Sequence, residues 1–224
     1  NATEGEQYSR IVLSQAQQQY ESRTIAFKRG DIVDRNGTVL ATSERVYNLI
    51  LDCLVVNDVT QDAEGNDVQK YVEPTVKALV EVLGMDEKDI RSRLESDETK
   101  NSQYQVLATN LSIEEKTKFE EYLDVESEEN EDLTEDEILE RQNVKGVWFE
   151  EDYQRVYPLN SLACDLIGFT YSDNEADWGI EGYYSSVLNG TDGRQFGYLN
   201  SDADVEQTII PAQDGNNVVS TIDW

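Results

Sequence analysis

Apolar residues follow two different spacings along the first quarter of the chain. Between residues 6 and 23 they recur about every four positions, which predicts an amphipathic helix. Residues 24–56 are rich in Val, Ile, Thr and Tyr and contain turn residues, a composition typical of strands. Asn36-Gly37 separates two short apolar runs inside this stretch. The pair predicts a hairpin turn, because both residues tolerate positive φ.

The middle of the chain predicts helices after a polar loop at 57–70. An apolar stripe follows Pro74, which suits a first helical turn, and ends at Gly84, which suits a carboxyl-terminal cap. Further helix starts are marked by capping residues, the last two within the S/T-x-x-E pattern: Asp86, Ser112 and Thr134. Alternating side chains at 103–108 predict one strand among these helices.

The last third of the chain predicts both strands and helices. Residues 144–158 are typical of a strand, and residues 159–168 carry a helical apolar face that ends at Gly168. A shorter helix is expected at 179–190, and the tail is interpreted as two strands joined through Asp214-Gly215. This order of elements predicts an α+β fold, with mostly antiparallel strands around a helical insertion.

The chain has 224 residues, a length that suits one large domain or two small ones. The pattern of elements divides it into four segments. We expect an N-terminal helix at 1–24, strands at 25–56, a mostly helical inserted subdomain at 57–143, and strands with helices at 144–224.

Composition narrows the classes of function. The chain carries 47 acidic and 18 basic residues, a formal net charge of −29. Such a surface repels phosphate backbones and anionic lipid headgroups, which argues against nucleic acid as a partner. The sequence contains no histidine, so the commonest general base and the commonest zinc ligand are both missing.

The acidic residues are densest at 124–140, where ten acidic residues occur without a basic one. We interpret this stretch as a solvated, mobile insertion, because like charges repel one another; a cation-binding or partner-binding patch is the alternative. A calcium loop is not supported elsewhere. Asn200-x-Asp202-x-Asp204 begins like an EF-hand loop, but Val205 replaces the required glycine and Pro211 the final glutamate.

The cysteines and the chain ends give further expectations. Cys53 and Cys164 are too few for a zinc cluster or a disulfide scaffold, and we expect two buried free thiols, with a disulfide as the alternative. No apolar run approaches the roughly 20 residues that a membrane span needs. Asn1-Ala2 resembles the remnant of a cleaved tag, so we expect that a natural amino-terminal signal or anchor has been removed.

Motifs of the common enzyme classes are missing from the sequence. Ser172-Asp173-Asn174 matches the S-D-N element of penicillin-interacting serine enzymes, but that chemistry also needs S-x-x-K and K-T-G, and neither occurs. A chance match is therefore the better interpretation. We predict no catalytic residue, no cofactor and no metal for this chain.

Segments in order along the chain together resemble the non-catalytic amino-terminal module of class B penicillin-binding proteins. RGDIVDRNGTVLA at 29–41 is similar to the signature R-G-x-I-x-D-R-N-G-x-x-L-A of that family. RVYPLNSLACDLIGF at 155–169 resembles its R-x-Y-P segment and the following helix. WGIEGYYSSVLNGTDG at 178–193 resembles its G-x-E-x-x-Y…L-x-G-x-x-G segment. The closing GNNVVSTID, at 215–223, resembles the strand that leads into the transpeptidase domain.

The resemblance implies a structural role for the residues that match these motifs. They are Arg29, Gly30, Asp31, Asp34, Arg35, Asn36, Gly37, Arg155, Pro158, Gly168, Gly179, Glu181, Gly182 and Gly190. The glycines permit backbone geometry that other residues resist. We expect the charged residues of the first motif to pair with Arg155, Glu181 and nearby backbone, and so to fix how distant segments pack. Replacing Arg35 or Glu181 by Ala is expected to lower Tm by several degrees.

For function, the resemblance implies a dimerisation or pedestal domain without an activity of its own. Its parent would be a serine D,D-transpeptidase on the extracytoplasmic face of a bacterial membrane, anchored by a single span upstream of Tyr8. The implied partners are the C-terminal transpeptidase domain of the same polypeptide, membrane proteins of cell-wall synthesis, and a second copy of the chain in a homodimer. The acidity favours a Gram-positive source.

Two other functions are compatible with parts of the sequence. Arg29-Gly30-Asp31 is the tripeptide of many adhesion proteins, so a free-standing surface adhesin is one alternative, although the triplet leads directly into a strand. The abundant carboxylates allow a hydrolase as the other, although no pair stands out as a catalytic dyad.

Overall fold

The computed structural model describes residues 23–61, 65–127, 130, 132–160, 164–171, 174–199 and 205–223. They form two compact units, one of residues up to Glu44 and from Tyr153 onward, the other of Arg45–Asp152. Helices and mostly antiparallel strands occur in the described chain, so the predicted α+β class is confirmed. The helix expected at 6–23 lies outside the described residues, and the division into four segments stays a prediction.

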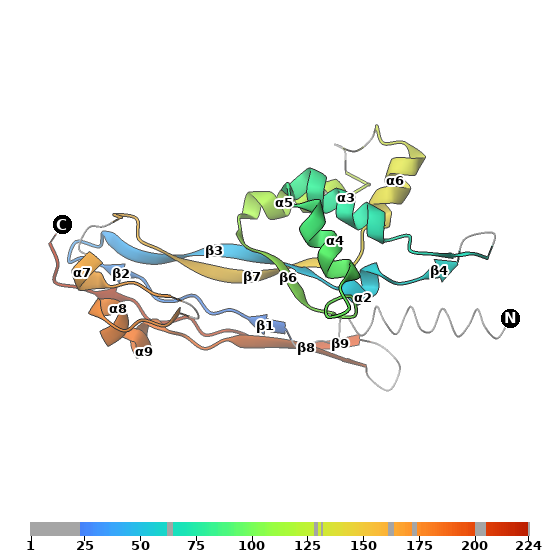
Figure 1. The fold of residues 1–224 in the computed structure, drawn as a ribbon. Coiled ribbons are helices and arrows are strands. Elements are labelled where there is room, and N and C mark those ends of the chain that lie inside the picture. Colours follow the sequence, from blue (N-terminus) through green and yellow to red (C-terminus); the bar gives the residue numbers. More distant parts are fainter. Residues whose placement is uncertain are drawn as a thin grey trace. The chain divides into compact units, whose positions relative to one another are not determined.

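The first unit contains a three-stranded antiparallel sheet in the order β1-β8-β9 (Figure 1). Its strands are β1 (Arg23–Ile25), β8 (Gly193–Leu199) and β9 (Val205–Ile210). A second set of strands consists of β2 (Ile32–Val33), β3 (Val39–Leu51), β7 (Val147–Val156) and β10 (Val218–Val219). β2 pairs antiparallel with β3 and parallel with β10, and β7 also pairs with β3.

The tail therefore differs from the prediction of two strands joined through Asp214-Gly215. β8 and β9 form the antiparallel pair, and the strand after Gly215 is β10, which joins the parallel neighbour β2 instead. The pairing of β10 is set by residues almost 190 positions away, such as Val218 against Ile32, so local sequence does not reveal it.

The β2–β3 hairpin is confirmed, but its turn differs in detail. Asp34 accepts hydrogen bonds through Oδ1 from the amides of Asn36 and Thr38, at 2.8 and 2.7 Å. Gly37 has a φ of 89°, whereas Asn36 is not among the described residues with positive φ. The buried Asp34 carboxylate therefore holds the turn, and only its glycine adopts the left-handed conformation.

Short helices close the core of the first unit. They are α7 (Cys164–Ile167), α8 (Gly179–Tyr183) and α9 (Ser185–Leu188). The core itself contains Ile32 and Leu40 of the hairpin, Ile167 of α7 and Leu188 of α9. The single helix expected at 179–190 is divided at Tyr184, and the described part of the helix expected at 159–168 is only one turn long. Cys164 in α7 is exposed and free, which corrects the expectation of two buried thiols.

The second unit is mainly helical. Its elements beside β3 and β7 are α2 (Cys53–Val56), β4 (Thr60–Gln61), β5 (Asp67–Val68), α3 (Val72–Leu83), α4 (Glu87–Glu95), β6 (Gln105–Leu111), α5 (Ile113–Leu123) and α6 (Glu135–Gln142). α2 replaces the strand expected through residue 56, because Asp52 caps it through a hydrogen bond from the Val55 amide. β4 and β5 form a small antiparallel ladder in the predicted loop 57–70.

The predicted helix boundaries of this unit are confirmed. Gly84 caps α3 with a φ of 65°, and Asp86 caps α4. Ser112 and Thr134 form capping boxes with Glu115 and Glu137. The last part of the acidic stretch 124–140 thus lies in α6 instead of an extended insertion. Buried side chains of β3, α3, α4 and α5 form the core, and Cys53 lies in it.

Candidate functional site

A single buried carboxylate, that of Glu181, joins segments of the first unit that are distant in sequence. Glu181 lies in the first turn of α8 and is fully buried. Its Oε2 accepts a hydrogen bond from Nε of Arg29 at 2.9 Å and lies 2.8 Å from Nη2 of the same guanidinium group in an ion pair. Its Oε1 accepts from Nε of Arg155 at 2.8 Å. The side chains of Arg29 and Arg155 are 0% and 3% exposed, so both ion pairs are screened from water.

Backbone carbonyls and amide side chains complete the shell around the two guanidinium groups. Arg29 donates to the carbonyls of Glu181 and Asn174, at 2.9 and 3.2 Å, and to the side chain of Asn189. Arg155 donates through Nη1 to the Gly30 carbonyl at 2.8 Å and to Ser43 Oγ at 3.2 Å. These acceptors help to compensate the second positive charge, because one carboxylate serves two cations.

One atom of this cluster is not satisfied within the part of the chain that the structure describes. Nη2 of Arg155 is buried and has no hydrogen-bond partner there. An unpaired buried N–H group costs free energy. The ion pair between Arg155 and Glu181 offsets this cost, so the stability of the cluster depends strongly on the Glu181 carboxylate.

Tyr157 links the cluster to the segment after α7. Its hydroxyl donates to Glu181 Oε1 at 3.3 Å and accepts from the Thr170 amide at 2.9 Å. Burial, together with the nearby Glu181 charge, raises the pKa of Tyr157 above its ordinary value. The phenol is therefore a stable neutral donor at physiological pH.

The motif glycines lie where backbones approach closely. A Cβ on Gly30 would lie 2.0 Å from the Asn216 carbonyl oxygen, and one on Gly190 would lie 2.0 Å from that of Gln213. Gly168 and Gly179 face each other with positive φ, at 79° and 69°. Gly182 lies similarly close to Asp177. Side chains at these positions would separate the segments that the charge cluster joins.

The remaining motif residues do not belong to the cluster. Asp31 accepts from Thr42 Oγ1 at 2.7 Å, and Asp34 and Asn36 form the turn described above. Pro158 is exposed in the turn after β7. Arg35 pairs with Asp223 at 3.1 Å, but the two side chains are 55% and 64% exposed. Arg35 therefore pairs within the chain, but it does so at the surface and not with Arg155 or Glu181.

Sequence reasoning also missed four contributors to the site. They are Ser43, Tyr157, Asn174 and Asn189. Tyr157 stands in the R-x-Y-P segment and Asn189 in the L-x-G segment, so the motifs contained a signal for these two. Ser43 and Asn174 gave none, because each is placed by tertiary structure alone.

The charged groups of the cluster are directed at one another. Glu181 forms ion pairs with Arg29 and Arg155, whose side chains are buried, and Nη2 of Arg155 alone among these charged atoms has no partner in the described residues. Within the described ranges, no group of three His, Cys, Asp or Glu residues could hold a metal ion. Among the described helices, none combines the length and the apolar composition needed to cross a membrane. The arrangement can hold segments together.

Comparison with known proteins identifies the family of this chain. The family model of the penicillin-binding protein dimerisation domain matches residues 24–220. The chain belongs to this family.

Two curated relatives show how much of a longer protein this module represents. Stage V sporulation protein D of Bacillus subtilis is 28% identical over 208 residues, which are 90% of this chain and 27% of that protein. Peptidoglycan D,D-transpeptidase FtsI of Buchnera aphidicola is 26% identical over 170 residues, 75% of this chain and 24% of that protein. The chain spans about a quarter of the length of these relatives.

Solved structures share the fold. A peptidoglycan synthetase from Bifidobacterium adolescentis matches with a TM-score of 0.55 and 24% identity over 90% of this chain and 36% of that one. Penicillin-binding protein 2X from Streptococcus thermophilus matches with a TM-score of 0.54 and 21% identity, over 89% and 29%. A complex between penicillin-binding protein PBP2 and MreC from Helicobacter pylori matches with a TM-score of 0.53 and 16% identity, over 89% of this chain and 35% of that one.

Proposed function

We propose that this chain is the non-catalytic pedestal of a membrane-anchored penicillin-binding protein. It positions a transpeptidase domain for peptidoglycan cross-linking and docks partner proteins of cell-wall synthesis. The observation that carries this proposal is the buried Arg29–Glu181–Arg155 cluster, which ties the first motif to α8 and the end of β7. A rigid joint of this kind suits a support, since its groups are committed to packing.

The last described residues support the positioning role. The amide of Val218 donates to the Asp31 carbonyl at 2.8 Å, and the Arg35 amide donates to the Ile222 carbonyl at 2.9 Å. The Asp31 amide also donates to Asn217 Oδ1 at 2.7 Å. A catalytic domain attached after this segment would therefore start from backbone that is bonded to the first motif.

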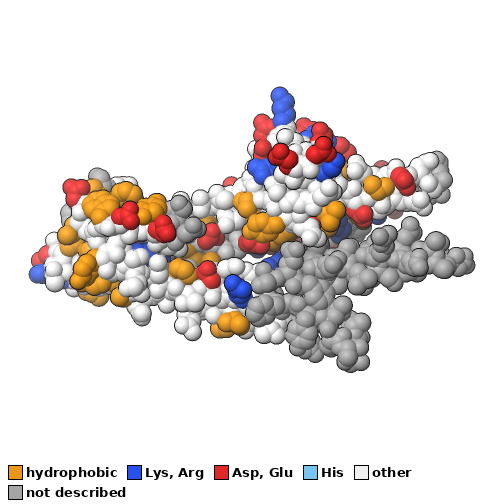
Figure 2. Space-filling view, turned by 60° about the horizontal axis from the view of Figure 1, so that its bottom comes forward, with side chains coloured by type: hydrophobic (Ala, Val, Ile, Leu, Met, Phe, Trp, Pro, Cys, Tyr) orange, Lys and Arg blue, Asp and Glu red, His pale blue; other side chains and the backbone are white. Residues whose placement is uncertain are grey.

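Exposed aromatic residues support contact with further protein. Figure 2 shows orange side chains gathered over the α7–α9 region of the first unit. The exposed apolar residues there include Leu166, Phe169, Trp178 and Tyr183, and Tyr183 is 82% exposed. Apolar patches on a soluble surface commonly mark interaction sites. The fold shared with a PBP2–MreC complex agrees with a docking role.

The parent is proposed to be a serine D,D-transpeptidase on the extracytoplasmic face of a Gram-positive membrane. The name of one relative and the short share of the relatives' length that the chain covers support the transpeptidase part of this proposal. The Gram-positive source rests on the acidity of the chain alone. The adhesin alternative is disfavoured, because Arg29 is fully buried and Asp31 bonds to Thr42. A homodimer through this module is a further part of the proposal.

The pedestal role can be tested in cells that lack the natural gene. One allele encodes the full chain, and a second joins the membrane span directly to the catalytic domain. Both products should label with fluorescent penicillin, and only the full chain should restore the cross-linked fraction of peptidoglycan. If the allele without the pedestal restores cross-linking equally, the proposal is overturned.

A further inference from the structure

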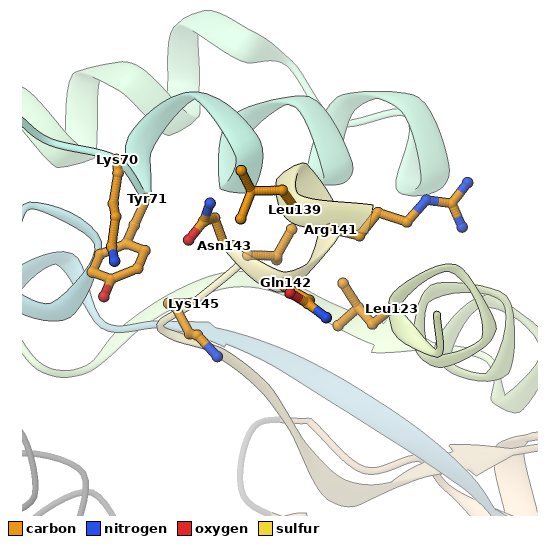
Figure 3. Close-up of a pocket in the computed structure, with 9 residues that line it drawn as sticks. Lys70, Tyr71, Leu123, Leu139, Arg141, Gln142, Asn143 and Lys145 are labelled. Atoms are coloured by element: carbon orange, nitrogen blue, oxygen red, sulfur yellow. The ribbon is translucent and has the colours of Figure 1, made fainter. Parts of the chain in front are cut away.

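A hollow of about 600 Å³ lies within the second unit, between the start of α3, the end of α5 and the end of α6. Its lining comprises Lys70, Tyr71, Leu123, Leu139, Arg141, Gln142, Asn143, Val144 and Lys145 (Figure 3). This volume falls in the range of about 300–1,000 Å³ that is usual for ligand pockets.

Two lysines bring positive charge to the hollow in a chain whose net charge is −29. Other basic residues of the second unit are already used in ion pairs, such as Lys77 with Glu140 at 2.7 Å and Arg93 with Asp89 at 3.2 Å. Lys70 and Lys145 form no ion pair within the described residues, although the chain has 47 acidic residues. Lys70 lies over the Tyr71 ring, 5.0 Å from its centroid, and Lys145 is exposed.

Arg141 differs from these lysines, because its guanidinium is already used. Its Nη1 donates to the Tyr122 carbonyl and to Asn130 Oδ1, both at 2.9 Å, and the group lies 4.1 Å from the centre of the Tyr122 ring. In Figure 3 the Arg141 side chain points away from Lys70 and Tyr71. Arg141 therefore stabilises the side of the hollow, and Lys70 and Lys145 supply the positive charge that a ligand could contact.

The rest of the lining is apolar or carries an amide. Leu139 is 58% exposed, and Leu123 is partly buried across the hollow. The side chains of Gln142 and Asn143 can donate to and accept from a peptide backbone. Positive charge, apolar surface and amides together fit a peptide better than a compact inorganic anion.

We infer that this hollow docks an acidic peptide segment of a partner protein. Its Asp or Glu side chains would pair with Lys70 and Lys145, and a neighbouring apolar side chain would cover Leu139 and Leu123. This inference deepens the docking part of the proposed function by assigning it a surface and a chemical class of partner.

The test starts with a display library of random dodecapeptides selected on the wild-type chain. We expect the enriched peptides to combine acidic with apolar residues. Their affinity is then measured by fluorescence polarisation for Lys70→Glu/Lys145→Glu and for Leu139→Ser. We expect the double variant to raise Kd by about tenfold or more, and Leu139→Ser to raise it severalfold. Circular dichroism tests whether each variant is folded. If Lys70→Glu/Lys145→Glu is not folded, Lys70→Gln/Lys145→Gln is measured in its place.

Lys88→Glu/Lys118→Glu is the matched control, since it changes the net charge equally. Both lysines are exposed on α4 and α5, outside the lining of the hollow. The control should change Kd by less than about threefold. The inference is overturned if no peptide is enriched, if the enriched peptides lack acidic residues, if the control loses as much affinity, or if Leu139→Ser has no effect. Such a result would leave the cross-linking test of the pedestal role unaffected.

Discussion

At the scale of single residues, the first unit depends on one carboxylate more than on any exposed charge. Glu181 accepts hydrogen bonds from two arginines and a tyrosine, all in a site closed to water. Exposed pairs such as Arg35–Asp223 contribute little, because water and salt screen them. Removing the side-chain charge is therefore expected to destabilise the protein at Glu181 and to have little effect on its stability at Arg35.

Glu181→Ala should destabilise the first unit by about 3–5 kcal/mol, because it leaves two buried guanidinium groups without their carboxylate. Thermal unfolding followed by circular dichroism measures the change. Arg35→Ala serves as the control: because its pair with Asp223 is exposed, the loss of several degrees expected from the sequence is revised to a degree or two at most. Equal Tm values for all chains would show that the cluster does not hold this unit together.

Gly30→Ala should cost more stability than Gly84→Ala. A Cβ at position 30 would lie 2.0 Å from the Asn216 carbonyl oxygen, so the segment before β10 must move. At Gly84 nothing lies within 4 Å of the added Cβ, and the cost is only the left-handed conformation, about 1–2 kcal/mol. Chemical denaturation of both variants compares the two costs. The close approach would be unimportant if Gly84→Ala proved the more damaging change.

At the scale of elements, the boundaries of α3 to α6 could be predicted, whereas the helices of the first unit were located only approximately. The starts of α4, α5 and α6 are determined by capping residues a few positions away. α8 and α9 have no side-chain cap, and glycine contacts with other segments set their ends. Apolar spacing alone therefore predicted one helix where the structure has two.

Ser112→Ala should lower the stability of the second unit by about 1 kcal/mol, because the hydroxyl accepts from the Glu115 amide at 3.2 Å. Urea unfolding measures the loss. Ser92→Ala, at an exposed position inside α4, is the matched control and should not destabilise the protein. A loss of the same size in both variants would exclude the cap as the cause.

The capping carboxylates also predict a dependence on pH. Hydrogen bonds from Ser112 lower the pKa of Glu115, and those from Thr134 lower the pKa of Glu137 below the ordinary value of 4.5. A lowered pKa in the folded state means that this stabilisation is complete above pH 4.5 and is lost as the pH falls through the folded pKa. The Tm difference between wild type and Glu115→Gln should therefore shrink from pH 7 to pH 3. A constant difference would contradict the assignment.

At the scale of the whole molecule, the sequence predicted the α+β class and most strands, but long-range pairing was less accessible. The motif resemblance brought together Arg29, Arg155 and Glu181, which the structure places within hydrogen-bonding distance. The same resemblance suggested Arg35, which lies at the surface. A motif identifies which residues lie near one another in the fold. Burial decides which of them contribute to the free energy of unfolding, and burial depends on the complete fold.

The central claim is that this chain is a non-catalytic module of a penicillin-binding transpeptidase. The most direct measurement is covalent labelling by fluorescent penicillin of two purified chains, residues 1–224 and the full natural gene product. We predict that the full product labels and that residues 1–224 do not, because the S-x-x-K nucleophile motif is absent from them. Covalent labelling of residues 1–224, or a full product that does not label, would contradict the account.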